Sequence, residues 1–354
     1  MRRRGLPVSA VGAAAGERVN DRVDRLDCAD DPERARNVGL AIGLLVVAFA
    51  PNYPTLVVGG VMIGACNGVM DVAMNALGVD AERASGTAVM SRFHAFFSLG
   101  GFLGALLVMG SAKLQGGDGA DPRWALVAAA IFAGAGLTAL FALTPQAPHV
   151  EDSTDDAAPI SPRSGDAPPR PGIPPQAWLL GVMALFFGFT EGTAIDWASI
   201  HVTDVAHVDP GVGAAGLVCV SATMVVIRLL GDSLVARFGR AAVVRFGAPV
   251  AVAGFGVVIT TSSLPLILVG WLLVGLGVGM IAPQIYAIAG HIGGGRVLAI
   301  VTAFGYTAFL AGPGIIGFLS NHFGIQRAMI LPFVAGLLLT GLTFTAALRD
   351  PQES

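Results

Sequence analysis

The sequence predicts an all-α integral membrane protein with about ten transmembrane helices, arranged as four followed by six. Of the 354 residues, 54% are hydrophobic and only 13% are charged, whereas about 25% of the residues in a soluble domain are charged. The apolar runs are close to the roughly 20 residues that a spanning helix needs. They are too long and too continuous for the short alternating strands of a membrane β-barrel.

The predicted elements follow one another in a simple order. Residues 1–36 are expected to form a cytoplasmic segment without a complete spanning helix. Spanning helices are expected near residues 37–52, 55–77, 89–112 and 123–144, and then near 176–197, 211–231, 242–262, 265–289, 296–319 and 326–348. The first of them is short for a complete crossing.

A linker divides these helices. Residues 145–175 are rich in Pro, Asp and Ser and have no apolar period, which is typical of a disordered segment. We therefore expect an N-terminal bundle at 37–144, a C-terminal bundle at 176–348 and a short tail at 349–354.

Loop charges predict the orientation. Arg237, Arg240 and Arg245 lie close together in one short loop, while the turns at 51–54 and 262–265 carry no charge. Loops rich in arginine remain on the cytoplasmic side of a membrane. The prediction is a multi-pass protein of the cell inner (plasma) membrane, with both termini and the linker in the cytoplasm.

The two groups of helices share a repeat. At an offset of 211 residues Pro54 aligns with Pro265, and the same shift aligns four further positions: Gly59 with Gly270, Gly64 with Gly275, Gly68 with Gly279, and Ala76 with Ala287. A near-constant offset over two helices indicates parallel repeats.

The repeat also bears on the start of the chain. Arg22 falls opposite Arg237 at an offset of 215, so residues 5–15 are expected to be the end of an incomplete helix. The first half would then lack one whole helix and most of a second. A signal peptide is the competing interpretation, because arginines, a short apolar run and small residues open the sequence.

Several strings resemble the major facilitator superfamily (MFS). Residues 231–240 (GDSLVARFGR) are similar to the loop between the second and third helices of each half in that family, with Ala236 in place of the usual acid. More specific strings, similar to bacterial permeases of the fucose-permease-like branch, are residues 71–75 (DVAMN), 93–101 (FHAFFSLGG), 191–197 (EGTAIDW) and 305–314 (GYTAFLAGPG).

The resemblance covers about residues 16–348 and implies an MFS-type two-bundle fold with ten of the usual twelve helices, numbered three to twelve. It also implies a secondary transporter that moves a small polar solute, such as a sugar or metabolite, by alternating access with protons. The family helix that normally faces the candidate residues across the cavity is missing from this prediction.

Asp71 and Asn75 are the first candidates for solute or proton binding. They share one helix face with Gly64 and Gly68. A carboxylate in hydrocarbon costs roughly 2.5–3.5 kcal/mol on insertion scales, so Asp71 is expected to point into the protein. The alternative is a structural hydrogen bond to a neighbouring helix.

Other polar groups within apolar segments complete the candidate site. His94 and Glu191 could titrate or bind solute, although a helix-packing histidine is the alternative for His94. Gln284, Tyr286 and Tyr306 suit a hydroxyl-bearing ligand, but such residues also satisfy helix contacts.

A gate is predicted at one end of the bundle. Arg228 and Asp232 are four residues apart on one helix, so they could pair. With Arg237 they are expected to form an inward-facing salt-bridge latch, which the family resemblance supports.

Several classes of function are disfavoured. The net charge of -3 indicates no nucleic-acid partner, and Cys28, Cys66 and Cys219 form no metal or disulfide pattern. No cofactor or metal is predicted; the expected partners are the lipid bilayer, a solute and protons.

An intramembrane enzyme is a remote alternative, since only Ser98 and His94 approach a dyad. A second alternative is a non-transporting remnant or the product of a misplaced start codon.

Overall fold

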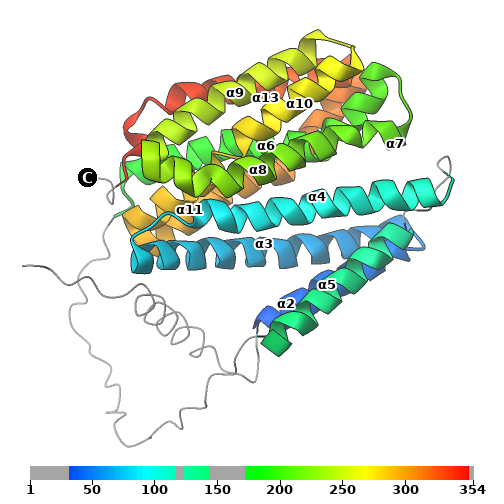
Figure 1. The fold of residues 1–354 in the computed structure, drawn as a ribbon, viewed down its shortest axis with the longest axis horizontal. Coiled ribbons are helices and arrows are strands. Elements are labelled where there is room, and N and C mark those ends of the chain that lie inside the picture. The colour runs from blue at the N-terminus through cyan, green and yellow to red at the C-terminus, as the bar shows by residue number, and fades with distance from the viewer. Residues whose placement is uncertain (1–31, 117–120, 122, 144–171, 351–354) are drawn as a thin grey trace, which may run out of the picture.

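The computed structural model describes residues 32–116, 121, 123–143 and 172–350, and no strand occurs among them (Figure 1). Before the long gap lie α2 (Pro32–Ala48), α3 (Tyr53–Ser85), α4 (Met90–Leu114) and α5 (Arg123–Leu143). After the gap lie α6 (Pro175–Ala206), α7 (Pro210–Gly213), α8 (Ala215–Phe238), α9 (Arg240–Thr260), α10 (Leu264–Val278), α11 (Ala282–Phe323), α12 (Ile325–Ala328), α13 (Ile330–Leu342) and the 3₁₀ turn η1 (Ala346–Leu348). Most of the predicted N-terminal segment and linker lies outside the described residues.

The predicted class, an all-α integral membrane protein, is confirmed. Within the described residues, 7 helical stretches are long and apolar enough to cross a membrane, and 2 shorter apolar helices accompany them at Gly39–Ala48 and Arg123–Gly136. The stretch Leu264–Phe323 has 60 residues, far more than the roughly 20 of one crossing. It contains a break at Gly293 and Gly294, between the two helices predicted at 265–289 and 296–319.

Helix caps explain why α3 is longer than predicted. Asn52 caps its first turn, with Oδ1 accepting from the Thr55 backbone N at 3.0 Å. The helix continues beyond the apolar run to Ser85, where Gly86 adopts φ 66° and donates its N–H to the Glu82 carbonyl. Because glycine tolerates this left-handed conformation, the C-cap and not the loss of hydropathy sets the end of the helix.

The helices before and after the gap meet along one seam. Figure 1 shows α3 and α4 side by side, with α4 lying along α8, while α3 also contacts α11. The pair α2 and α5 packs at the far end of α3, away from α8. We call α2 to α5 the N-terminal group and α6 to α13 the C-terminal group. The larger apolar core lies in the C-terminal group, where α6 packs on α11 and α9 on α10.

Glycines let α9 and α10 touch through their backbones. A Cβ atom on Gly277 would lie 2.3 Å from the backbone N of Ala251 and 2.6 Å from the carbonyl O of Gly247. Backbone atoms cannot turn aside as a side chain can. We therefore expect Gly277→Ala to lower the free energy of unfolding by about 1–3 kcal/mol, the usual cost of overpacking.

The matched control is Gly104→Ala on α4, where an added Cβ atom meets nothing within 4 Å. There the higher helix propensity of alanine should leave stability unchanged or slightly higher. Unfolding in mixed detergent micelles measures both variants. An equal loss of stability in the two would contradict the close approach of α9 and α10.

Candidate functional site

A hydrogen bond in the middle of the bundle joins the two groups. The Tyr306 hydroxyl on α11 donates to Asp71 Oδ2 on α3 at 2.8 Å. The Tyr306 hydroxyl oxygen also lies 3.4 Å from the carbonyl oxygen of Gly68, one turn before Asp71 on α3. Both side chains are half-buried. Asp71 therefore points into the protein, as predicted, and binds a residue of the other group.

A second contact lies one turn further along α3. His94 Nε2 on α4 is 2.9 Å from Asn75 Oδ1. Because an amide oxygen only accepts, this nitrogen carries the hydrogen. The Asn75 Nδ2 atom is buried and has no hydrogen-bond partner among the described residues. The ring of Tyr286 stacks near His94, with centroids 6.0 Å apart.

Arg228 is a buried cation at the centre of the seam. Its side chain is 1% exposed, and Nη2 donates to Glu191 Oε1 on α6 at 2.6 Å. Nε donates to the Gly279 carbonyl at 3.2 Å, and Nη1 donates to Ser98 Oγ on α4. These bonds compensate the desolvation of the ion pair. Arg228 thus links α8 to helices of both groups.

We call this set of side chains the central cluster. Its members are Asp71, Asn75, His94, Ser98, Glu191, Arg228, Tyr286 and Tyr306. Helical spacing explains how the N-terminal group contributes four of them, since Asp71 and Asn75, and likewise His94 and Ser98, lie one turn apart on adjacent helices. Six of the seven predicted solute or proton candidates meet here.

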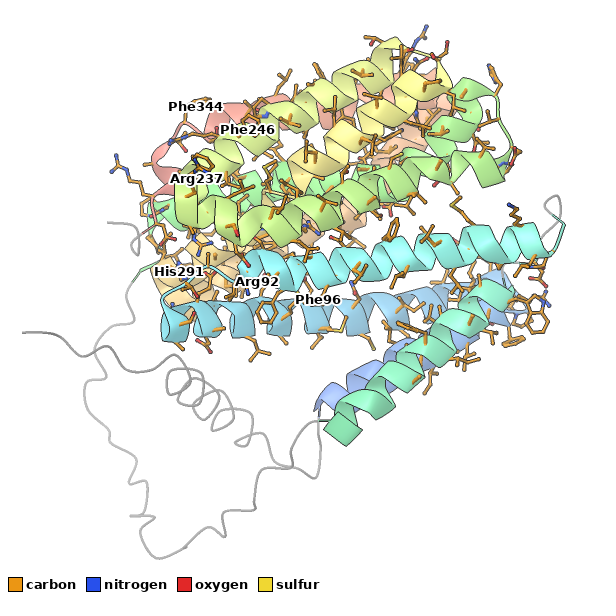
Figure 2. The ribbon with its side chains drawn as sticks, viewed as in Figure 1. Arg92, Phe96, Arg237, Phe246, His291 and Phe344 are labelled. Carbon is orange, nitrogen blue, oxygen red and sulfur yellow. The ribbon has the colours of Figure 1, made fainter. Side chains whose placement is uncertain are left out.

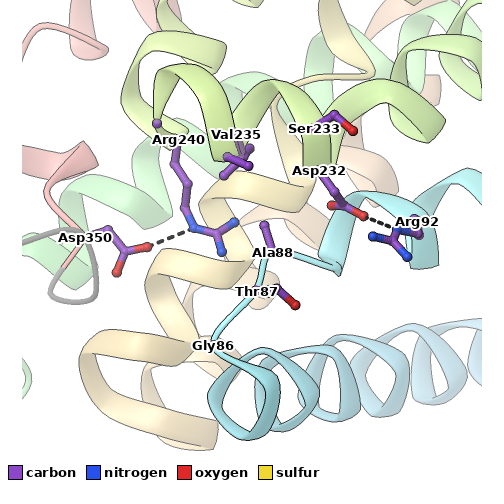
Figure 3. A pocket seen from close by; sticks show the side chains of 11 residues that line it. Gly86, Thr87, Ala88, Arg92, Asp232, Ser233, Val235, Arg240 and Asp350 are labelled. Carbon is purple, nitrogen blue, oxygen red and sulfur yellow. Dashed lines mark hydrogen bonds and ion pairs between the residues drawn. The ribbon is translucent and has the colours of Figure 1, made fainter. Parts of the chain in front are cut away.

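The seventh candidate, Gln284, belongs to a separate cluster at the end of α3. Its Oε1 accepts from Arg240 Nη1 at 2.8 Å, and its Nε2 donates to Ser91 Oγ at 3.0 Å. Arg240, at the start of α9, also pairs with Glu82 Oε2 at 2.7 Å and with Asp350 Oδ2 at 2.8 Å. Figure 3 shows the Arg240–Asp350 pair.

We call Glu82, Arg240, Gln284, His291 and Asp350 the latch cluster. Glu82 contributes from the N-terminal group and the others from the C-terminal group. The other oxygen of Glu82 accepts from the backbone N atoms of Val89 and Met90, at 2.9 and 3.0 Å. Glu82 therefore fixes the start of α4 and closes the seam at this end. Figure 2 shows His291 and Arg92 at the same end of the molecule.

The predicted pair of Arg228 and Asp232 is wrong. Asp232 accepts from Arg92 Nε at 2.9 Å and from the Ser91 backbone N at 3.0 Å, as Figure 3 shows for Arg92. Arg228 turns to the central cluster instead. Spacing of four residues permits a contact, but both side chains find partners on other helices. Arg237 is exposed, and its guanidinium lies 5.3 Å from the Phe238 ring centroid.

A groove of about 650 Å³ opens beside the latch cluster. It is lined by the α3–α4 loop, Arg92 and Asp232, and by Arg240 and Asp350. Both signs of charge line it equally, so it has no strong preference for an anion. Among the residues that the structure describes, no His, Cys, Asp and Glu side chains group in a way that could hold a metal ion.

The chain belongs to the Major Facilitator Superfamily, whose family model matches residues 37–294. An uncharacterized transporter of Sinorhizobium fredii is 31% identical over 299 residues, which cover 84% of this chain and 74% of the relative. An uncharacterized MFS-type transporter of Yersinia pestis is 30% identical, with 85% and 74% covered. The chain is therefore a membrane transporter and not an enzyme.

Solved structures agree on the fold. The human organic anion transporter MFSD10 (TETRAN) superposes with a TM-score of 0.62 at 18% identity, covering 88% of this chain and 76% of that one. FucP, an MFS transporter in the outward conformation, gives a TM-score of 0.54 at 14% identity, with 87% and 82% covered.

Proposed function

We propose that this protein is a proton-coupled secondary transporter that moves a small, neutral, hydroxyl-bearing solute by alternating access. The central cluster carries the proposal, because it places titratable and hydrogen-bonding side chains of both helix groups together inside apolar helices. Ionisable residues within membrane helices are expensive and usually functional. A cluster that bridges two groups of helices can couple binding to their relative movement.

Asp71 is the proposed proton carrier. Glu191 forms an ion pair with Arg228, whereas Asp71 forms no ion pair with any described residue and is held by the neutral Tyr306 hydroxyl. Protonation of Glu191 would leave the Arg228 guanidinium without its carboxylate. Protonation of Asp71 breaks no ion pair, so Asp71 is the acid that can exchange a proton at the lower cost.

Protonation of Asp71 would also loosen the seam. A hydrogen bond to a carboxylate is roughly twice as strong as one between neutral groups. When Asp71 is protonated, its bond to Tyr306 loses this charge assistance, and α3 is held less tightly to α11. The proton thereby changes the balance between states in which the two groups are joined or separated at the centre.

The solute class follows from the groups that remain available. The buried Asn75 Nδ2 atom has no partner within the described residues, and an unmet buried donor costs about 1–3 kcal/mol. A solute hydroxyl could accept that hydrogen, with Tyr306 and His94 close by. When Asp71 is protonated, the only charges left in the central cluster are those of the Glu191–Arg228 ion pair, and they cancel. A site without net charge favours an uncharged solute.

The latch cluster is proposed to close the cytoplasmic end, in line with the arginine-rich segment around residues 237–245. The proposal includes a location in the inner membrane, with both termini in the cytoplasm. Opening this end requires the Glu82–Arg240 pair to separate, because that pair joins the two groups.

Uptake into proteoliposomes tests the proposed function. We expect saturable entry of at least one labelled aldohexose, deoxyhexose, pentose or cyclic polyol under an inward proton gradient, and loss of that uptake with a protonophore. Liposomes without protein are the control. If none of these solutes enters above the control, the proposal of a proton-coupled transporter for a neutral, hydroxyl-bearing solute is contradicted.

A further inference from the structure

His291 lies between two carboxylates in the latch cluster. Its Nε2 atom is 3.2 Å from Glu82 Oε2, and its Nδ1 atom is 3.2 Å from Asp350 Oδ1 and Oδ2. The His291 side chain is 1% exposed. A neutral imidazole has a hydrogen on only one nitrogen, whereas an imidazolium has one on each. Nδ1 hydrogen-bonds Asp350, whereas Nε2 makes no hydrogen bond to any described residue and lies only within ion-pair distance of Glu82. With a carboxylate oxygen 3.2 Å from each ring nitrogen, the charges around the ring favour the protonated form.

Charged groups from every packed element surround this ring. Helix α3 brings Glu82 and also Arg83, whose guanidinium donates to the Gly290 carbonyl next to His291. Helix α9 brings Arg240, which pairs with the same two carboxylates as His291. The chain after η1 brings Asp350. Two acids thus face His291 directly, and the nearby arginines partly offset them.

The position of Asp350 is built into the fold. Gln176 Nε2 at the start of α6 donates to the carbonyl oxygens of Ala347 and Arg349, at 3.0 and 2.7 Å. These bonds hold the segment after η1 against α6. The Asp350 carboxylate is consequently fixed beside His291 and Arg240, although the sequence suggests only a tail there.

We propose that His291 makes the latch sensitive to pH, so that the latch end opens as the pH on that side rises. This inference rests on the proposed alternating access. At low pH the imidazolium attracts Glu82 across the seam and Asp350 within the C-terminal group. Loss of the proton turns one ring nitrogen into a lone pair facing a carboxylate, which repels it. The latch is therefore strong at a pH at which His291 is protonated and weak at a higher pH, at which it is neutral.

The consequence is a directional bias. A compartment of higher pH on the latch side favours the open state at that side, where a protonated Asp71 would also lose its proton. Proton release at the central cluster and opening at the latch cluster would then respond to the same gradient. The two histidine contacts with Glu82 and Asp350 give this bias a structural basis.

Distance measurements between spin labels test the inference. Ser85 at the end of α3 and Ala242 at the start of α9 are both exposed, and they belong to different helix groups. Labels are attached to cysteines at these two positions after Cys28, Cys66 and Cys219 are replaced by alanine. Between about pH 5.5 and about pH 8.5, which bracket the usual histidine titration, the population with the longer distance should rise about threefold or more.

Two variants and a control sharpen the test. His291→Gln removes the titrating group, so its distance distribution should not change with pH. Asp350→Asn removes one facing carboxylate, so the midpoint of opening should fall by about one pH unit or more. His322→Gln is the matched control, because His322 lies exposed on the same helix and contacts only the Phe318 carbonyl and nearby rings; it should behave as the unchanged protein.

The inference would be overturned if the distance distribution of the unchanged protein did not change with pH. So would a pH response that persists in His291→Gln, or, if that variant does not fold, an unshifted midpoint in Asp350→Asn. Solute uptake separates this result from the proposed function. Uptake without a pH-dependent distance overturns the latch inference alone, whereas a pH-dependent distance without uptake supports the latch and contradicts the transport proposal.

Discussion

Asp71→Asn is expected to abolish proton-driven accumulation of the solute while exchange of solute across the membrane continues. Asparagine has nearly the same shape and can still accept the Tyr306 hydrogen bond, but it cannot gain or lose a proton in this pH range. A gradient of one pH unit supports up to about tenfold accumulation when one proton accompanies each solute. The variant should reach only equal concentrations on both sides.

Uptake of a solute that the unchanged protein accepts measures this effect, first with a proton gradient and then in exchange without one. Asp196→Asn is the matched control, since Asp196 is an exposed acid on the apolar helix α6. It should keep full accumulation. Concentrative uptake that survives in Asp71→Asn would remove Asp71 from the coupling mechanism.

Arg228→Met is expected to cause the largest loss of stability among single substitutions in the central cluster. It leaves the Glu191 carboxylate buried without its cation. Removing one partner of a buried pair costs about 3–5 kcal/mol. The double variant Glu191→Gln with Arg228→Met should be more stable than Arg228→Met alone, because it leaves no unpaired charge. Unfolding of the unchanged protein, both single variants and the double variant in mixed micelles measures the coupling.

Arg92→Met is the matched control for this cycle. Arg92 also pairs with an acid across the seam, Asp232, but its side chain is 61% exposed. Exposed ion pairs contribute about 0–1 kcal/mol, so this variant should lose little stability. If the double variant is as unstable as Arg228→Met, the cost does not come from an unpaired carboxylate and the interpretation of the Arg228–Glu191 pair is wrong.

The sequence was sufficient to predict the helices and part of the central cluster. Hydropathy marked the apolar runs, and the cost of charge in a membrane singled out Asp71 and Glu191. Hydropathy could not place the end of α3, because a glycine cap sets it at Gly86. It did locate the break at Gly293 and Gly294, which lies between the helices expected at 265–289 and 296–319.

The latch cluster was the harder part to predict. Glu82 and Arg240 are 158 residues apart, and no local spacing indicates such a pair. Glu82 stands at the end of an apolar run, where an acid ordinarily meets solvent. Asp350 follows the last helix, where a short tail was expected. Local spacing favoured Arg228 with Asp232, but packing of the two groups gave each a different partner.

The most direct test of proton coupling is whether solute entry carries protons. Proteoliposomes hold a trapped pH-sensitive dye, and an inward gradient of an accepted neutral solute is imposed at equal pH on both sides. With proton coupling through Asp71, the interior should acidify as the solute enters, and Asp71→Asn should admit solute without protons. Solute entry by the unchanged protein without any acidification would contradict proton coupling through the central cluster.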